Sequence, residues 1–309
     1  EVENGDGVIA EGLPVRRSGR ASAFINVMYG CNNFCSYCIV PYVRGRERSR
    51  AAADVLDEAK ILMEDGVQEI TLLGQNVNSY QGGGGAFAEL LSRLDEMGVP
   101  RIRFMTSHPK DLSEELIEAY RTLPHLCKQL HLPVQAGSDR ILGLMNRGYT
   151  REKYLRLVEH LRAACPDIGL TTDLIAGFPG ETAAEFEETL SLAEAVRFDA
   201  AFTFIYSPRP GTRAASMEDG TPMAEKTARI ERLIALQRAV TAEILAAQVG
   251  MVQAVLVEGA SARNPGWISG KTDRGHMVNF PGNIESVGRM VAVKIVSAGR
   301  NTLRGSAIE

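Results

Sequence analysis

Three cysteines crowd into one short segment near the start of the chain, Tyr29-Gly30-Cys31-Asn32-Asn33-Phe34-Cys35-Ser36-Tyr37-Cys38-Ile39-Val40-Pro41. The segment directly follows residues 24–29, an apolar run typical of a β-strand. Thiols at the spacing CxxxCxxC can converge on one inorganic core when the chain loops around it. A [4Fe-4S] cluster usually takes four cysteines, so three leave one iron open to a small-molecule ligand. We therefore predict that Cys31, Cys35 and Cys38 hold such a cluster.

Two other interpretations of these cysteines are weaker. A closed zinc site normally needs a fourth protein ligand, and no further Cys or His lies nearby in the sequence to complete it. Three buried thiols without any metal are the second alternative. The remaining cysteines, Cys127 and Cys165, lie far apart and are expected to be ordinary buried thiols.

The composition is that of a folded chain without a membrane segment. It has 309 residues, of which 45% are hydrophobic and 23% charged, enough to bury a sizeable core. No stretch approaches the roughly 20 uncharged apolar residues of a membrane span, and the acidic start is not a signal peptide. An odd count of five cysteines argues against a secreted disulfide framework. We expect a cytoplasmic protein.

Residues 24–248 alternate β-rich runs with amphipathic helical windows, the pattern of repeated βα units. Strands are expected at 24–29, 69–73, 101–105, 128–132, 170–175 and 201–206, and helices at 51–65, 86–97, 113–123, 150–164, 182–196 and 223–248. Parallel strands with helical crossovers form an α/β sheet, either open or curled into an incomplete barrel. Ligands of such folds gather at the carboxyl ends of the strands.

A different pattern begins after Gly250, where short β-like runs at 252–257, 267–271, 276–280 and 289–296 predict a small all-β module. From Gln253 onward the chain carries a net charge of about +3, whereas the rest carries about −7. This basic tail indicates an anionic partner or simply a solvated surface. The division expected is a linker over 1–22 from an upstream domain, a core over 23–248 and the β module over 249–309.

The cysteine segment, with an aromatic residue before its last Cys and a strand ahead of it, resembles the radical S-adenosylmethionine superfamily. Residues 24–50, 72–78, 103–109, 132–138 and 171–179 further resemble the MiaB-type tRNA methylthiotransferases. The tail, through Val257-Glu258-Gly259 and Leu303-Arg304-Gly305, is similar to the TRAM module, a small OB-like barrel that binds RNA. The fold class implied is α/β, a (β/α)6 partial barrel of the radical S-adenosylmethionine type followed by an all-β TRAM barrel.

The resemblance also implies a reaction and its partners. S-adenosylmethionine would chelate the fourth iron, and one electron from flavodoxin or ferredoxin would release a 5′-deoxyadenosyl radical. The radical would attack C2 of N6-isopentenyladenosine at position 37 of tRNA, giving the 2-methylthio product without a further catalytic side chain. Sulfur would come from a second [4Fe-4S] cluster, replenished by a sulfur or cluster donor. Family members hold that cluster in a domain ahead of the core, which this sequence lacks. A fragment of a longer, monomeric enzyme is therefore expected.

Further site residues are expected at the strand ends. Those that would bind S-adenosylmethionine or the substrate base are Tyr37, Gln75, Asn76, Gln135, Ser138, Asp173, Ile175, Gly177 and Phe178. Capping and loop hydrogen bonds are the alternative role for the polar ones, and a simple turn is the alternative at 177–180.

Basic residues supply the expected contacts to RNA. They are Arg44, Arg46, Arg48, Arg50, Arg263, Lys271, Arg274 and Arg304. Affinity for RNA should then fall with salt. Trp267, Phe280 and His276 could stack on unpaired bases, but filling the core of the small barrel is the favoured role of Trp267 and Phe280.

Two rival functions remain at this stage. A close relative could modify threonylcarbamoyl-adenosine in tRNA or an aspartate of a ribosomal protein with the same cluster. A non-catalytic RNA-binding protein with a structural metal would keep the basic tail, but it would need a fourth protein ligand.

Overall fold

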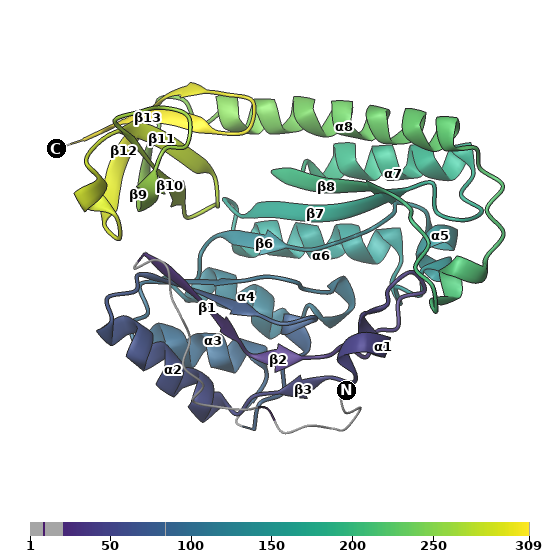
Figure 1. Ribbon diagram of the computed structural model, residues 1–309, viewed down its shortest axis with the longest axis horizontal. Helices are drawn as coiled ribbons and strands as arrows, with labels where there is room; N and C mark the ends of the chain where they lie inside the picture. The colour runs from purple at the N-terminus through teal and green to yellow at the C-terminus, as the bar shows by residue number, and fades with distance from the viewer. Residues whose placement is uncertain (1–8, 10–20, 84, 309) are drawn as a thin grey trace.

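The computed structural model describes residue 9, residues 21–83 and residues 85–308, so nearly all of the expected linker over 1–22 lies outside the described residues. A larger α/β body carries a small barrel at one end (Figure 1). The parallel strands of the larger body are β1 (Ser22–Asn26), β4 (Glu69–Leu73), β5 (Arg101–Phe104), β6 (Gln129–His131), β7 (Gly169–Ala176) and β8 (Ala200–Ile205). They form two sheets, β1-β4-β5 and β6-β7-β8, connected by a parallel bridge between Ile102 and Leu126. This arrangement confirms the partial barrel, with β1 and β8 as its edges.

Helices alternate with these strands. The long ones are α2 (Ala52–Glu64), α3 (Phe87–Glu96), α4 (Glu114–Thr122), α6 (Arg151–Ala164), α7 (Ala183–Val196) and α8 (Met223–Ala246). The short elements are β2 (Met28–Tyr29), α1 (Val40–Arg44), β3 (Arg48–Ser49), α5 (Asp139–Leu144) and the 3-10 turns η1 (Val77–Ser79), η2 (Pro109–Asp111), η3 (Arg213–Ser216) and η4 (Ile284–Ser286). Local signals set the boundaries: Thr182 and Glu185 form a reciprocal capping box at the start of α7. No helix among the described residues is long and apolar enough to cross a membrane.

The C-terminal module is a closed barrel with strand order β10-β11-β13-β12-β9. Its strands are β9 (Val252–Ala260), β10 (Trp267–Thr272), β11 (Met277–Pro281), β12 (Met290–Ala298) and β13 (Leu303–Ala307). Phe280 fills its core as expected, but Trp267 is only half-buried and lies under the Arg304 guanidinium, 5.9 Å from the ring centroid. The expectation of a core Trp267 is therefore wrong, because its side chain lies at the barrel surface.

The turn between β10 and β11 closes the amino-terminal end of the partial barrel. Glu69, at the start of β4, accepts hydrogen bonds from Arg101 (2.9 Å) and Arg103 (2.8 Å), and all three side chains are buried. Both arginines also donate to the backbone carbonyl of Thr272, at 2.9 and 2.7 Å. The N–H groups of this buried Arg–Glu–Arg cluster that do not bind Glu69 thus donate hydrogen bonds to the backbone of the turn.

A second cluster joins the same turn to β8. The carboxylate of Asp199 accepts from Arg274 Nε (2.6 Å) and Nη2 (3.1 Å), from His276 Nε2 (2.8 Å) and from the backbone N–H of Leu170 (3.0 Å). The packing is close, since a Cβ added at Gly169 would lie 2.6 Å from Arg274 Cγ. The small barrel is therefore tightly packed against the larger body at this junction.

Candidate active site

The three cysteines lie on a loop between β2 and β3, and its fold depends on Gly30. Gly30 has a φ of 76°, and its N–H donates to Gln75 Oε1 at 2.6 Å. A Cβ at this position would stand 2.0 Å from the carbonyl oxygen of Arg46, so no other residue fits. The N–H of Cys31 then donates to the carbonyl of Gly45, 3.2 Å away. The loop is thus folded back on itself, and Gln75 holds its first residue.

The three thiols lie close enough to influence one another. Burial raises the pKa of Cys31, and the neighbouring Glu47, Cys35 and Cys38 raise it further. Burial also raises the pKa of Cys38. Without a metal these side chains therefore favour the neutral thiol, and binding of a cationic iron core would stabilise them as thiolates. The donor set fits the predicted cluster, although among the described residues no three His, Cys, Asp or Glu side chains are placed as ligands of a single metal ion.

Arg147, which the sequence analysis missed, lies beside this loop. Its side chain is only 4% exposed, and Nη1 lies 3.3 Å from Cys35 Sγ and 3.3 Å from the hydroxyl oxygen of Tyr37. It also donates to Tyr149 (2.9 Å) and to the carbonyl of Pro133 (2.7 Å). No carboxylate of the described residues pairs with it. Because a buried guanidinium needs an anion, Arg147 fits a site that receives a negatively charged group.

His108 provides a second N–H beside the same sulfur. Burial, aided by the charges of Arg147 and Lys110, lowers its pKa to about 2, so the ring is neutral. The backbone N–H of Lys110 donates to Nδ1 at 3.1 Å, which leaves the ring proton on Nε2. Nε2 lies 4.0 Å from Cys35 Sγ. The sulfur of Cys35 is thus approached by two donors, an arrangement suited to a thiolate.

Asn76 lies at the carboxyl end of β4 and is linked to the cysteine loop. Its Nδ2 donates to Asp111 Oδ2 (2.8 Å) and Glu47 Oε1 (3.3 Å), and Glu47 accepts from the N–H of Asn32 (3.0 Å). Within residues 21–83 and 85–308, nothing hydrogen-bonds to the buried Oδ1 of Asn76 or to the buried hydroxyl oxygens of Ser36 and Ser107. Unpaired buried acceptors at strand ends are compatible with a ligand that donates hydrogen bonds.

The backbone is strained at two neighbouring strand ends. Thr106, after β5, has a φ of 68°, and Gln135, after β6, has a φ of 75°. Such conformations are unfavourable for residues other than glycine and cluster at ligand sites. Gln135 pairs with β7 through Asp173 and Ile175, with both hydrogen bonds at 2.9 Å. The predicted cofactor residues Gln135 and Asp173 are thereby placed on adjacent chain segments.

Three predicted cofactor residues are engaged within the protein. The hydroxyl of Ser138 donates to Glu185 at 3.3 Å. Ile175 and Phe178 are buried, and Phe178 packs edge-on against Tyr206 at 5.3 Å. Their side chains therefore pack in the core in this structure, and contact of this stretch with a base stays a prediction. Gly177 has a φ of 68° and donates to Glu181 at 2.7 Å.

The basic residues after the cysteine loop separate into two groups. Arg44 and Arg46 are exposed, and Arg48 is half-buried. Arg50 corrects a prediction: it is buried, it donates to Glu58 at 2.7 Å, and it also donates to the carbonyl of Asn26 at 2.8 Å. Its role is structural, because these contacts fix it beneath the loop.

The basic residues of the small barrel separate in the same way. Arg263 and Arg304 are exposed, and Lys271 pairs with Glu258 at 3.0 Å. Arg274 is the second correction, because it is held by Asp199 in the junction described above.

The two remaining cysteines are buried, as expected. Burial raises the pKa of the Cys127 thiol to about 12.

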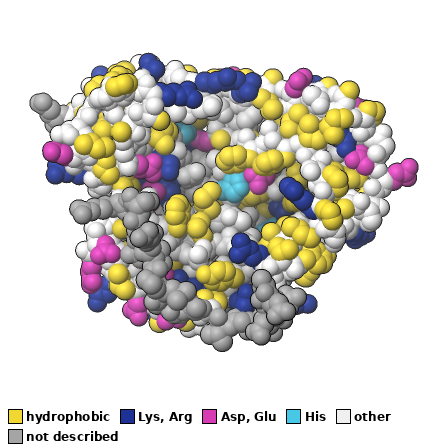
Figure 2. All heavy atoms as spheres, in the orientation of Figure 1, with side chains coloured by type: hydrophobic (Ala, Val, Ile, Leu, Met, Phe, Trp, Pro, Cys, Tyr) yellow, Lys and Arg dark blue, Asp and Glu magenta, His cyan; other side chains and the backbone are white. Residues whose placement is uncertain are grey.

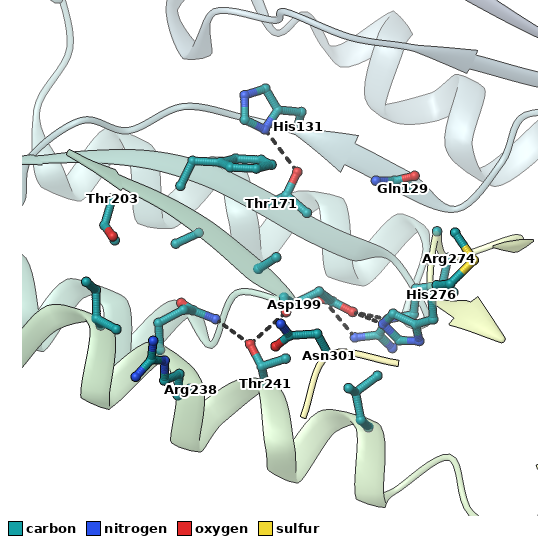
Figure 3. A pocket seen from close by; sticks show the side chains of 18 of the residues that line it. Gln129, His131, Thr171, Asp199, Thr203, Arg238, Thr241, Arg274, His276 and Asn301 are labelled. Atoms are coloured by element: carbon teal, nitrogen blue, oxygen red, sulfur yellow. Dashed lines mark hydrogen bonds and ion pairs between the residues drawn. The ribbon is translucent and has the colours of Figure 1, made fainter. Parts of the chain in front are cut away.

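A cavity of about 600 Å³ lies between the inner face of the sheet, α8 and the small barrel (Figure 3). His131 and Thr171 line it and are linked by a hydrogen bond of 3.0 Å. Asp173 Oδ1 lies 3.7 Å from His131 Nε2, so the cavity adjoins a residue predicted to bind the cofactor. Its far end is bounded by the Asp199–Arg274–His276 cluster (Figure 3).

Comparisons with known proteins identify the class of the larger body. Residues 25–193 match the model of the radical SAM superfamily, and residues 246–308 match that of the TRAM domain. Two solved structures share the fold. The radical S-adenosylmethionine methyltransferase TsrM from Kitasatospora setae has a TM-score of 0.55 and 18% identity, covering 84% of this chain and 47% of that one. Coproporphyrinogen III oxidase from Escherichia coli has a TM-score of 0.50 and 20% identity, covering 73% and 54%. The core is thus a radical S-adenosylmethionine domain.

Closer relatives specify the family. A protein of Pelobacter propionicus is 53% identical over 299 residues, covering 96% of this chain and 68% of the relative. One of Acetivibrio thermocellus is 50% identical over 312 residues, covering 100% and 65%. Both are named tRNA-2-methylthio-N(6)-dimethylallyladenosine synthase, and the chain belongs to this family. It spans about two thirds of the length of these relatives.

Proposed function

We propose that this chain forms the radical-generating and RNA-binding part of an enzyme that converts N6-isopentenyladenosine at position 37 of tRNA to its 2-methylthio derivative. The observation that carries the proposal is the loop of Cys31, Cys35 and Cys38 at the carboxyl end of the barrel strands, beside a buried Arg147 that no carboxylate of the described part of the chain pairs with. The names of both relatives favour this substrate over threonylcarbamoyl-adenosine or a ribosomal protein.

The three cysteines would bind three irons of a [4Fe-4S] cluster and leave the fourth for S-adenosylmethionine. When bound, the cluster and S-adenosylmethionine together supply one-electron cleavage of the sulfonium bond. The chain's own residues would bind and orient the cluster and S-adenosylmethionine. Gln75 fixes the loop through Gly30, Arg147 balances negative charge, and Asn76 presents an unpaired acceptor.

Four further groups would complete the cofactor site at the strand ends. Tyr37 lies on the cysteine loop, and Gln135 follows β6. Asp173 lies within β7, and the backbone of Gly177 follows that strand. Asp173 and the amide of Gln135 suit hydroxyl groups of a ribose, and the glycine allows close approach of a flat base.

The RNA would contact two basic surfaces. One is formed by Arg44, Arg46 and Arg48 beside the cysteine loop, and the other by the TRAM barrel, proposed to span 249–309, with Arg263, Lys271 and Arg304. Trp267 beneath Arg304 offers an aromatic face for an unpaired base. The salt dependence of affinity should therefore be strong.

Other parts of the reaction would lie outside residues 1–309. We propose that the second cluster, the source of sulfur, is held by the portion of the relatives that this chain does not span. An electron donor such as flavodoxin or ferredoxin and a sulfur or cluster donor would act on a monomer in the cytoplasm.

Anaerobic reconstitution with iron and sulfide tests the proposal. After addition of dithionite and S-adenosylmethionine, we expect about four irons per chain and release of 5′-deoxyadenosine. Cys35→Ala should lose both, whereas the matched variant Cys127→Ala should keep the iron. Bound zinc without 5′-deoxyadenosine would refute the enzymatic proposal and leave an RNA-binding protein, and about eight irons would show that the second cluster lies within this chain.

A further inference from the structure

The cavity beside His131 has an apolar inner wall whose side chains are exposed among the described residues. Phe202 on β8 is 55% exposed and Met105 after β5 is 44% exposed, and both line the cavity. The surface view shows hydrophobic side chains gathered around a histidine in the hollow of this face (Figure 2). Large exposed apolar side chains inside a concavity indicate a ligand with an apolar part.

Polar groups at the same end are fixed in orientation. His131 is held by Thr171 through Nδ1 (3.0 Å) and approaches Asp173 through Nε2 (3.7 Å). Its ring lies 6.1 Å from that of Phe202 in an edge-on arrangement. A planar base could thus meet an aromatic wall and a positioned imidazole beside the carboxylate proposed to bind the cofactor.

The charge distribution argues for a neutral ligand at this inner end. Of the two arginines that line the cavity, Arg274 is held by Asp199 at the barrel junction, and Arg238 projects from α8 (Figure 3). The wall itself consists of Phe202, Met105 and the ring of His131, so a hydrocarbon would be well accommodated beside it.

The exposed part of the cavity lining suits nucleic acid. Arg238 on α8 and Asn301 of the small barrel both line the cavity and are exposed. A phosphate at Arg238 would be charge-matched, and the cavity would connect it with the inner wall. Arg238 was not selected from the sequence, because it is one of several charges on an amphipathic helix.

We propose that this cavity is the specificity pocket for the modified nucleoside: Phe202 and Met105 contact the five-carbon group on N6, His131 contacts the purine, and Arg238 contacts the backbone phosphate. This inference rests on the proposed function and adds to it the residues that distinguish a prenylated adenosine from a plain one. Recognition of the hydrocarbon then depends on shape and apolar contact, so it has little dependence on salt.

Binding of two RNA stem-loops that differ in one group tests the inference. The probes are an anticodon stem-loop with N6-isopentenyladenosine at position 37 and the same RNA with adenosine, titrated into the reconstituted 309-residue chain with S-adenosylmethionine. Phe202→Ala should reduce the preference for the prenylated RNA by about tenfold, the effect of losing one good apolar contact. The matched control is Phe204→Ala, on the same strand and the same side, 51% exposed but outside the cavity. It should keep the preference.

The outcomes separate this inference from the proposed function. If wild type prefers the prenylated RNA and Phe202→Ala keeps that preference, or if both Phe variants lose it equally, the pocket is wrongly assigned. If wild type shows no preference and releases no 5′-deoxyadenosine, the proposed function itself fails. Equal 5′-deoxyadenosine release without RNA by wild type and Phe202→Ala shows that the variant is folded and that its cofactor site is intact.

Discussion

Removing the charge of Asp199 should loosen the small barrel from the core. Asp199→Asn keeps the size of the side chain and an oxygen for the N–H of Leu170, but it removes the anion that Arg274 and His276 share. The Asp199 side chain is 5% exposed and that of Arg274 is 27% exposed. The pair is thus largely, but not fully, shielded from water.

The magnitude follows from this burial. Breaking a fully buried ion pair costs about 3–5 kcal/mol, whereas exposed pairs contribute about 0–1 kcal/mol. Partial exposure of Arg274 places the expected loss between these limits, at about 2 kcal/mol of unfolding free energy for the small barrel. The bonds from Arg101 and Arg103 to the turn remain, so the barrel should stay docked in native buffer.

Trp267 makes the measurement specific. It is the one tryptophan of the sequence and lies in β10, so its fluorescence reports unfolding of the small barrel. The long helices of the described chain belong to the larger body, so circular dichroism reports unfolding of the core. In urea, Asp199→Asn should lower the fluorescence midpoint more than the dichroism midpoint. Glu243→Gln, which breaks an exposed pair with Arg197, serves as the control and should change little. A loss below about 0.5 kcal/mol in Asp199→Asn would refute the junction as a major stabilising contact.

Three further predictions follow from the geometry. Gly30→Ala should sharply reduce the iron bound after reconstitution, because its Cβ would clash with a carbonyl, whereas Gly143→Ala, within helix α5 with open space around it and no positive φ, should retain most of the iron. Arg304→Ala should reduce the salt dependence of RNA binding by about one phosphate contact, while Arg50→Ala should leave that slope unchanged and lower stability instead. Acid should undock the small barrel. Burial alone would raise the pKa values of Glu69 and Asp199, but their arginine and histidine partners lower them below 4.5 and 3.8 respectively. The two carboxylates therefore stabilise the junction above those values and lose this effect as the pH falls below them, which fluorescence of the barrel tryptophan can measure.

The fold of the core was predictable because its elements are long and periodic. The expected strand at 69–73 and the helix at 150–164 agree with β4 and α6 to within one residue. Short elements carry no such signal. The expected strand at 24–29 is divided at Val27, whose N–H bonds to Leu73. The strand β13 was missed because it has one large apolar residue, Leu303, and no β-branched residue.

The site was predictable where the chemistry is local in sequence. Three cysteines within eight residues are recognisable as a cluster site from the sequence alone. Arg147 is more than a hundred residues away and approaches them only in the folded chain. Arg50 and Arg274 show a related difficulty. A basic residue resembles an exposed nucleic-acid contact until its carboxylate partner is known; that partner is Glu58 on α2 for Arg50 and Asp199, 75 residues away, for Arg274.

The positions of the two ends of the core barrel limit how RNA can reach the cavity. The turn of the small barrel packs against Arg101, Gln129 and Asp199, at the amino ends of β5 and β6 and directly before β8, while the cysteine loop lies at the opposite, carboxyl end. With the barrel held by two buried clusters, an RNA that contacts Arg304 is held at a fixed distance from that loop. Swinging of the barrel would require breaking both clusters, so the RNA itself must supply the movement, by turning one nucleotide out of its stack and into the cavity. A nucleotide in a single-stranded loop does this at least cost, which favours an anticodon loop over a base-paired stem as the substrate.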